Sequence, residues 1–106
     1  LWEKQFSEDE LKKYFVDTWE VGAAVIFFLT TVFKRTQSKY GERGYRHILL
    51  EAGHIGQNLY LVSEALGLGC CAIGGTYDTE IEHLLDIDGV KESLVYTLVV
   101  GHREKL

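Results

Sequence analysis

The stretch that decides the fold is "RHILLEAGHIGQNLYLVSEAL", Arg46–Leu66, which predicts one long α-helix. It lacks proline and is rich in Leu, Ala and Glu, residues that favour a helix. Its apolar residues surround most of the helix circumference, a pattern typical of a helix that is buried on all sides. Gly53 and Gly56 weaken its helix propensity, and we expect these small residues to permit close approach of another backbone. Gly67 is expected to end the helix.

Two elements and a loop are predicted before the long helix. "SEDELKKYF" contains a capping box, Ser7-x-x-Glu10, and predicts a short helix over Glu8–Phe15. "VGAAVIFFLTTVF", Val21–Phe33, is apolar and β-branched without alternation, which favours a strand buried on both faces. The polar stretch Lys34–Tyr45 is expected to be a loop with at most one helical turn.

Three elements are predicted after the long helix. Cys70–Ile73 is expected to be a short strand or an extended connection. A second start signal, Thr79-x-x-Glu82, predicts a helix that runs to about Leu85. "SLVYTLVVG", Ser93–Gly101, predicts the final strand.

Composition limits the class of protein. The 106 residues are 46% hydrophobic and 25% charged, which suits one soluble globular domain over residues 1–106. The net charge of -5 argues against a nucleic-acid partner, which requires Lys and Arg to neutralise phosphates. Val21–Phe33 is too short to span a membrane, and no basic segment of a signal peptide precedes it. We therefore expect a cytoplasmic protein without membrane contact.

The start of the chain suggests a fragment. The sequence contains no methionine and no proline, and it begins with "LWEKQF". A chain without an initiating methionine is expected to be a processed piece or a fragment. We therefore expect that an N-terminal part of the native protein is missing.

A glycine-rich stretch, "GLGCCAIGG" (Gly67–Gly75), follows the long helix. Its first six residues match the dinucleotide pattern G-x-G-x-x-A, and Asp86 and Asp88 follow at a suitable distance. However, that pattern must follow a strand and open a helix, so that helix amides meet the phosphates. Here the glycines close a helix instead, and the carbonyl end of a helix repels phosphate. We therefore reject a dinucleotide loop.

Cysteines and histidines are not arranged as a metal or redox site. Cys70 and Cys71 are too close in sequence for an ordinary disulfide and, in a strand, point to opposite faces. We expect two small buried thiols beside a core strand. His47 and His54 share a helix face without nearby carboxylates, so we expect helix packing or an interface hydrogen bond. No metal site is predicted.

Gly74 and Gly75 leave two interpretations open. Two glycines allow a sharp strand-to-helix turn, which is an ordinary structural feature. They also let a ligand approach the backbone closely, and free N–H groups in such a turn can donate to an anion or a polarised ring atom.

The combined motifs resemble a known family. "GYRHILLEAGHIGQNLYLVSEALGLGCCAIGG" (Gly44–Gly75), "LLDIDG" and "YTLVVGH" are similar to the C-terminal half of the nitroreductase superfamily, especially the SagB-type peptide azoline dehydrogenases. The resemblance covers roughly Val21–His102. It implies a partial nitroreductase-like α+β fold with a mixed sheet. It also implies FMN at the interface of an intertwined homodimer, in which a long buried central helix, 46–66, packs against its mate.

The resemblance also assigns expected cofactor contacts. Ala72, Ile73, Gly74 and Gly75 would run along the isoalloxazine ring, with the two glycine amides near flavin N5 and O4. Arg103 would lie near the FMN phosphate, with Lys105 as a weaker candidate. The implied activity is hydride transfer through flavin N5, either NAD(P)H-dependent nitro or quinone reduction or azoline-type dehydrogenation of a peptide heterocycle. No catalytic acid or base is assigned.

The sequence departs from the family pattern upstream. The arginine-rich stretch that grips the FMN phosphate in this family is not found before Trp19. One alternative is therefore a flavin-free fragment that acts as a dimerisation or binding module, and another is a small unrelated α/β binding domain. Lys39-Tyr40 resembles a Lys-Tyr pair used by some azoline dehydrogenases, but we assign it no role.

Overall fold

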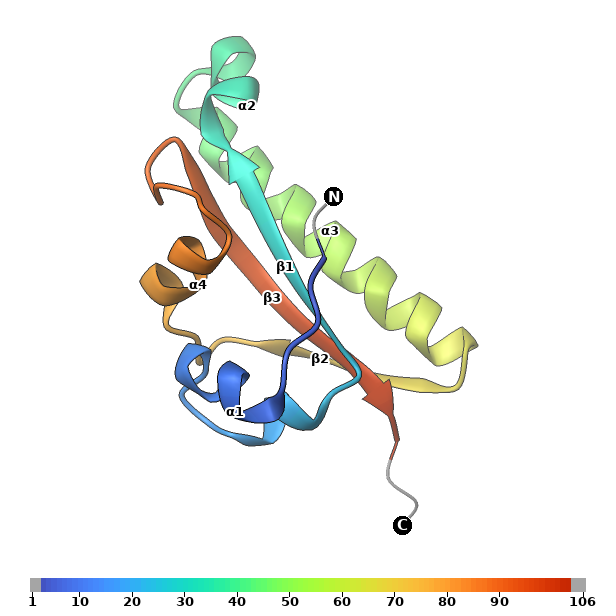
Figure 1. Cartoon of the computed structure of the whole chain (residues 1–106). Helices are drawn as coiled ribbons and strands as arrows, with labels where there is room; N and C mark the ends of the chain where they lie inside the picture. Colours follow the sequence, from blue (N-terminus) through green and yellow to red (C-terminus); the bar gives the residue numbers. More distant parts are fainter. Residues whose placement is uncertain (1–2, 104–106) are drawn as a thin grey trace.

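The computed structural model describes residues 3–103, which form a three-stranded sheet between a long helix and a layer of short helices (Figure 1). The elements in chain order are α1 (Glu8–Leu11), η1 (Lys12–Tyr14), η2 (Trp19–Gly22), β1 (Val25–Val32), α2 (Phe33–Tyr40), α3 (Arg43–Ala65), β2 (Leu68–Ile73), α4 (Asp78–Leu84) and β3 (Glu92–His102). No helix in the described part is long and apolar enough to cross a membrane.

The sheet has the order β1-β3-β2, with β3 in the centre. Both strand pairs are antiparallel, so the α+β class is confirmed, whereas the parallel pair that a mixed sheet requires is not seen within residues 3–103. The register shifts between Leu29 and Thr30, whose partners on β3 are Tyr96 and Leu94. The extra residue on β3 lets Leu94 share the face of Val99, because a bulge reverses the alternation of side chains.

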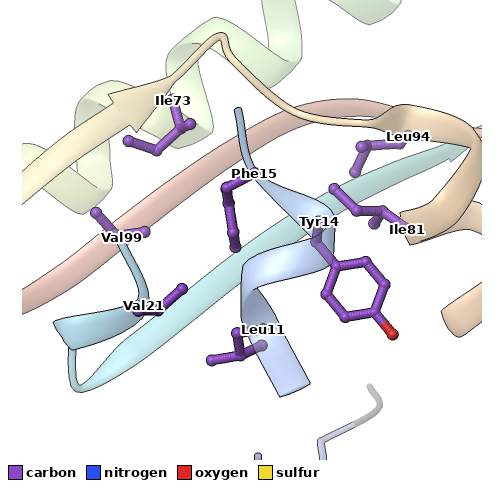
Figure 2. Close-up of a cluster of buried hydrophobic side chains, with 8 residues drawn as sticks. All are labelled: Leu11, Tyr14, Phe15, Val21, Ile73, Ile81, Leu94 and Val99. Atoms are coloured by element: carbon purple, nitrogen blue, oxygen red, sulfur yellow. The ribbon is translucent and has the colours of Figure 1, made fainter. Parts of the chain in front are cut away.

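The face of the sheet that carries Val99 is closed by the N-terminal segment and α4 (Figure 2). The buried cluster on this face consists of Leu11, Tyr14, Phe15, Val21, Ile73, Ile81, Leu94 and Val99. Backbone bonds hold the N-terminal segment in place. Val16 N donates to Gly75 O over 2.9 Å, and Tyr77 N donates to Tyr14 O over 2.9 Å.

The helix α3 lies on the opposite face of the sheet (Figure 1). It begins at Arg43, slightly before the predicted start, and ends near the predicted residue because Gly67 adopts a φ of 73°. The side it turns toward the protein is lined by small and branched residues, namely Gly44, Ile48, Ala52, Gly56 and Ser63.

The predicted role of the helix glycines requires correction. A Cβ at Gly56 would lie 2.5 Å from Cε2 of Tyr96, so Gly56 makes room for an aromatic ring of β3 and not for another backbone. A Cβ at Gly53 would meet nothing within 4 Å.

The expectation that the long helix is buried all round is also wrong for the single chain. Leu50 and Leu61 are 56% and 58% exposed, and both lie on the side of α3 that faces away from the sheet. Apolar residues thus occur on two sides of the helix. Within the chain, the sheet buries only one of these sides.

The first strand is shorter and less buried than predicted. Val21 and Gly22 belong to η2, and β1 begins at Val25. Ile26 and Phe28 pack against the core cluster, whereas Val25 is 47% exposed on the other face. Burial on both faces is therefore contradicted, because α3 does not extend over the whole of β1.

The predicted loop over Lys34–Tyr45 is largely helical, since it contains α2 and the start of α3. Tertiary contacts explain this difference. The ring of Phe33 stacks on Tyr45 with centroids 6.0 Å apart, and Gly44 lies so close to Gln37 that an added Cβ would be 3.1 Å from its Cα. The polar sequence therefore did not indicate that α2 and α3 pack against each other through Phe33, Tyr45, Gln37 and Gly44.

The short helices confirm one predicted start and contradict the other. Ser7 and Glu10 form the expected capping box, although the α-helix ends at Leu11 and continues only as the 3₁₀ turn η1. In contrast, α4 begins at Asp78 without a side-chain cap, so the predicted start signal at Thr79 does not operate. The predicted strands over Cys70–Ile73 and Ser93–Gly101 lie within β2 and β3.

Candidate functional site

The turn between β2 and α4 contains the predicted Gly74-Gly75 pair. Its carbonyls are engaged, because Val16 N donates to Gly75 O and Thr76 N donates to Gly74 O over 3.1 Å. Neither glycine amide donates to an acceptor within residues 3–103. Two N–H groups at the end of the sheet are therefore free to bind a ligand.

The two glycines differ in what surrounds them. A Cβ at Gly75 would lie 3.3 Å from Cβ of Val16, so close packing of the N-terminal segment accounts for glycine at this position. A Cβ at Gly74 would meet nothing within 4 Å. Neither packing nor a positive φ requires glycine at position 74, and its backbone faces open space.

An open cavity of about 300 Å³ lies beside this turn. It forms where β3 continues past the end of β2, because the pairing of these strands stops at Ile73 and Thr97. Asp78 is the charged residue of its lining, and its carboxylate accepts a hydrogen bond from the Thr76 hydroxyl. The lining residues are Ala72, Ile73, Gly74, Thr76, Asp78, Leu94, Val95, Tyr96 and Thr97.

The structure brings three predicted site residues to this cavity and leaves two outside its lining. Ala72, Ile73 and Gly74 line it, and Gly75 follows directly in the chain. Arg103 lies at the opposite end of β2, where its Nε donates to Leu68 O over 3.2 Å. At about 3.3 Å per residue, Gly74 and Leu68 are roughly 20 Å apart. Lys105 lies outside the described residues.

Arg103 has a partner within the chain. Its guanidinium forms an ion pair with Glu64 near the end of α3. Both side chains are at least half exposed, and exposed pairs contribute little stability because water screens them. Arg103 can therefore exchange Glu64 for another anion at small energetic cost.

The cysteines show no sign of a reactive site. Both are free thiols, and both are half-buried instead of fully buried as predicted. Burial raises the pKa of the Cys70 thiol, and a hydrogen bond with Ser63 offsets part of that effect. Cys70 thus stays protonated and is a poor nucleophile. Across residues 3–103, no three His, Cys, Asp or Glu side chains gather in a way that could hold a metal ion.

The Lys39-Tyr40 pair and His47 lie at the α2 end of the molecule, far from the Gly74 turn in the single chain (Figure 1). The Lys39 ammonium is 5.2 Å from the centroid of the Tyr40 ring, and the His47 ring meets Tyr40 edge-on at 5.0 Å. His47 thus makes the helix-packing contact that we predicted.

Sequence reasoning missed Tyr60. Its hydroxyl accepts a hydrogen bond from Ala72 N over 2.6 Å, which links α3 to the strand that leads into the Gly74 turn. In the sequence, Tyr60 counts as one more apolar residue of the long helix. The sequence could have indicated that a tyrosine on a packed helix needs a hydrogen-bond partner for its hydroxyl, since Tyr60 is half-buried. Only the packing of the helix identifies that partner as Ala72.

Comparison with known proteins gives consistent matches. The profile of the nitroreductase family matches residues 3–102. A candidate nitroreductase of Methanocaldococcus jannaschii is 37% identical over 81 residues, which cover 76% of this chain and 39% of that protein. The chain therefore spans about two fifths of this curated relative.

Two solved structures also resemble the chain. A crystal structure of a candidate nitroreductase from Anabaena variabilis matches with a TM-score of 0.78 and 32% identity, over 92% of this chain and 20% of that one. The Escherichia coli microcin synthetase McbBCD complex with truncated pro-MccB17 bound matches with a TM-score of 0.71 and 25% identity, over 76% of this chain and 30% of that one.

Proposed function

The chain belongs to the nitroreductase family, and on this premise we propose that the protein is an FMN-dependent oxidoreductase. The observation that carries the proposal is the environment of Gly74. Its amide has no acceptor within residues 3–103, its missing Cβ opens onto free space, and an open cavity lies beside it. A glycine that packing does not require, next to a cavity, is suited to close contact with a ligand.

The residues around the turn fit one edge of a flavin ring. The amides of Gly74 and Gly75 would donate to polar ring atoms, while Ile73 and Leu94 supply an apolar wall. When bound, FMN supplies two-electron chemistry in which a hydride passes through N5. Backbone donors fixed by the sheet stabilise added negative charge on a bound ring without reorganising. The contribution of this segment is therefore binding and orientation.

Arg103 is the residue that we propose for the FMN phosphate. It is exposed at the end of β3, and its ion pair with Glu64 is weak enough to be replaced by a doubly charged anion. The Arg103 guanidinium can bind phosphate with two parallel N–H bonds. Leu68, beside Arg103, lies roughly 20 Å from Gly74 along β2, which is more than the distance between the ring edge and the phosphate of one FMN. Arg103 would therefore have to leave Glu64 and extend toward the ring to reach the phosphate.

A homodimer through the helix 46–66 is part of the proposal. Leu50 and Leu61 lie three helical turns apart on the side of α3 that faces away from the sheet, and both are more than half exposed. Exposed large apolar side chains such as these two are suited to packing against an identical helix, with His54 and Gln57 between them on the same face. His54 lies on the same side, where it would face the partner helix.

Two reactions fit the proposed enzyme. One is NAD(P)H-dependent reduction of a nitro or quinone compound. The other is dehydrogenation of a peptide heterocycle, as in the SagB-type branch. The likeness to the McbBCD complex, whose solved structure holds a peptide, supports the second reaction. We propose that the protein acts in the cytoplasm, where both NAD(P)H and a peptide substrate would be available.

The test compares two glycine variants of the full-length protein. Purified wild-type protein should be yellow, with flavin absorbance and about one FMN per chain. Gly74→Ala should reduce FMN affinity at least about tenfold, because the new methyl group enters the space that the ring would occupy, while the fold has room for it. Gly22→Ala is the matched control, since a Cβ there also meets nothing within 4 Å but lies away from the turn.

Two results would contradict the proposal. A colourless wild-type preparation that also fails to bind added FMN would favour a flavin-free dimerisation or binding module. Equal FMN affinity in Gly74→Ala and Gly22→Ala would remove the turn from the binding site. The 106-residue chain alone should retain FMN weakly or not at all, because it lacks the arginine-rich phosphate grip of the family.

A further inference from the structure

Tyr60 joins the long helix to the edge of the sheet at the strand that precedes the Gly74 turn. β2 is an edge strand of the described sheet, since β3 pairs with only one side of it. Ala72 N donates to the Tyr60 hydroxyl over 2.6 Å, so this amide points away from β3 and toward α3. An unpaired edge amide is thereby satisfied by a side chain instead of another strand.

The register of α3 against the sheet is fixed by a series of specific contacts around Tyr60. One turn before it, Gly56 lies against the Tyr96 ring so closely that no Cβ would fit. One turn after it, Ser63 is buried on the side of the helix that faces the sheet. These contacts fix the position of Tyr60 along β2, where its hydroxyl accepts the hydrogen bond from Ala72 N.

The position of Ala72 determines what Tyr60 can control. Ala72 is the second-last residue of β2, and Gly74 is the first residue after the strand. The Ala72 amide is occupied by Tyr60, whereas the Gly74 amide has no acceptor within residues 3–103. The hydroxyl of Tyr60 thus anchors the strand immediately before the first free amide of the turn.

We propose that Tyr60 is a positioning residue for the flavin site. By holding the Ala72 amide, it fixes the end of β2 and thereby the direction of the Gly74 amide toward a bound ring. This inference rests on the proposed function. Tyr60 is assigned no contact with the cofactor, so it acts through Ala72 and not as a catalytic residue.

The experiment uses Tyr60→Phe in the full-length protein, because this change removes only the hydroxyl. The expected result is faster hydrogen exchange at the Ala72 amide and an FMN affinity lower by about threefold to tenfold, because a Gly74 amide that is no longer held in place forms a weaker hydrogen bond with the ring. The reduction potential of the bound FMN should also shift, because oxidised and reduced flavin depend differently on a donor at the ring edge. Tyr45→Phe is the matched control on the same helix, since the Tyr45 ring is exposed and its stacking on Phe33 survives the change.

The outcomes separate this inference from the proposed function. If wild-type protein binds FMN, and Tyr60→Phe has the affinity and potential of Tyr45→Phe, the positioning role is overturned even if thermal stability falls. If Ala72 exchange is unchanged in Tyr60→Phe, the anchoring contact itself is refuted. If wild-type protein does not bind FMN, the proposed function and this inference fail together.

Discussion

The two faces of the sheet differ in how completely the chain covers them. On the face that carries Val99, the N-terminal segment and α4 enclose a cluster in which Ile81 is fully buried. On the other face, α3 buries one side of itself and exposes Leu50 and Leu61 on the opposite side. The core on the Val99 face is therefore fully covered by residues of the chain itself. The layer on the other face exposes large apolar side chains on its outer side, of the kind that a partner covers.

The same difference appears in the glycines of the molecule. Gly56 and Gly75 are required by neighbours within the chain, namely the Tyr96 ring and Val16. Gly53 on α3 and Gly74 beside the cavity face open space. Gly22 on η2 faces open space as well. Of these three glycines, Gly53 lies where we propose a partner helix and Gly74 where we propose a cofactor.

The largest expected effect tests the enclosed layer. Ile81→Ala should lower the free energy of unfolding by about 2–5 kcal/mol, because a fully buried side chain is replaced by a cavity. Ile55→Ala on α3 is the matched control and should cost less than about 1 kcal/mol, since Ile55 is 43% exposed. Urea unfolding of both variants measures the difference. Equal losses would break the comparison and would show that Ile55 is buried in the native assembly.

An intermediate effect is expected from two glycines on α3. Gly56→Ala should destabilise the protein by about 1–3 kcal/mol, because the new Cβ would overlap the Tyr96 ring. Gly53→Ala should be neutral or stabilising by about 0.5–1 kcal/mol in a monomer, because alanine favours the helix and meets no neighbour. Thermal unfolding compares the two variants. A stable Gly56→Ala protein would mean that α3 packs less closely on β3 than described.

The smallest effect on the folded chain is expected at Leu61. Leu61→Glu should change the free energy of unfolding of the monomer by less than about 0.5 kcal/mol, because Leu61 lies mostly in solvent. It should nevertheless shift the protein from dimer to monomer, since a carboxylate would be buried in the proposed interface. Light scattering after size-exclusion chromatography measures the mass. Val90→Glu, at an exposed loop position, is the control, and a Leu61→Glu protein as dimeric as this control would argue against the helix 46–66 as the interface.

Several elements could be predicted because their signals are local. The capping box at Ser7 and Glu10, the end of α3 at Gly67 and the final strand all depend on residues close in sequence. The rejected dinucleotide loop belongs here too, because the structure continues from Gly67 directly into β2. The Gly74 turn was found from its two glycines, although its local sequence by itself favoured an ordinary turn.

Other features could not be predicted because they depend on distant residues. α2 was expected as a loop, since its polar sequence does not show that Phe33 stacks on Tyr45. The burial of β1 was overestimated, because an apolar run does not reveal how far the covering helix extends. Arg103 was assigned to the FMN phosphate and the Gly74 turn to the ring, and only the register of β2 and β3 shows that the two lie at opposite ends of the strand.

The sequence by itself determined a long apolar helix, the strands that follow and precede it, and the family to which the chain is similar. These depend on the period of apolar residues and on glycines at fixed places, which adjacent residues specify. Only the tertiary structure decided which side of α3 is covered, why Gly56 must be small and which amide Tyr60 holds. Each of these depends on how α3 lies against the sheet, and that placement follows from contacts between residues far apart in the chain.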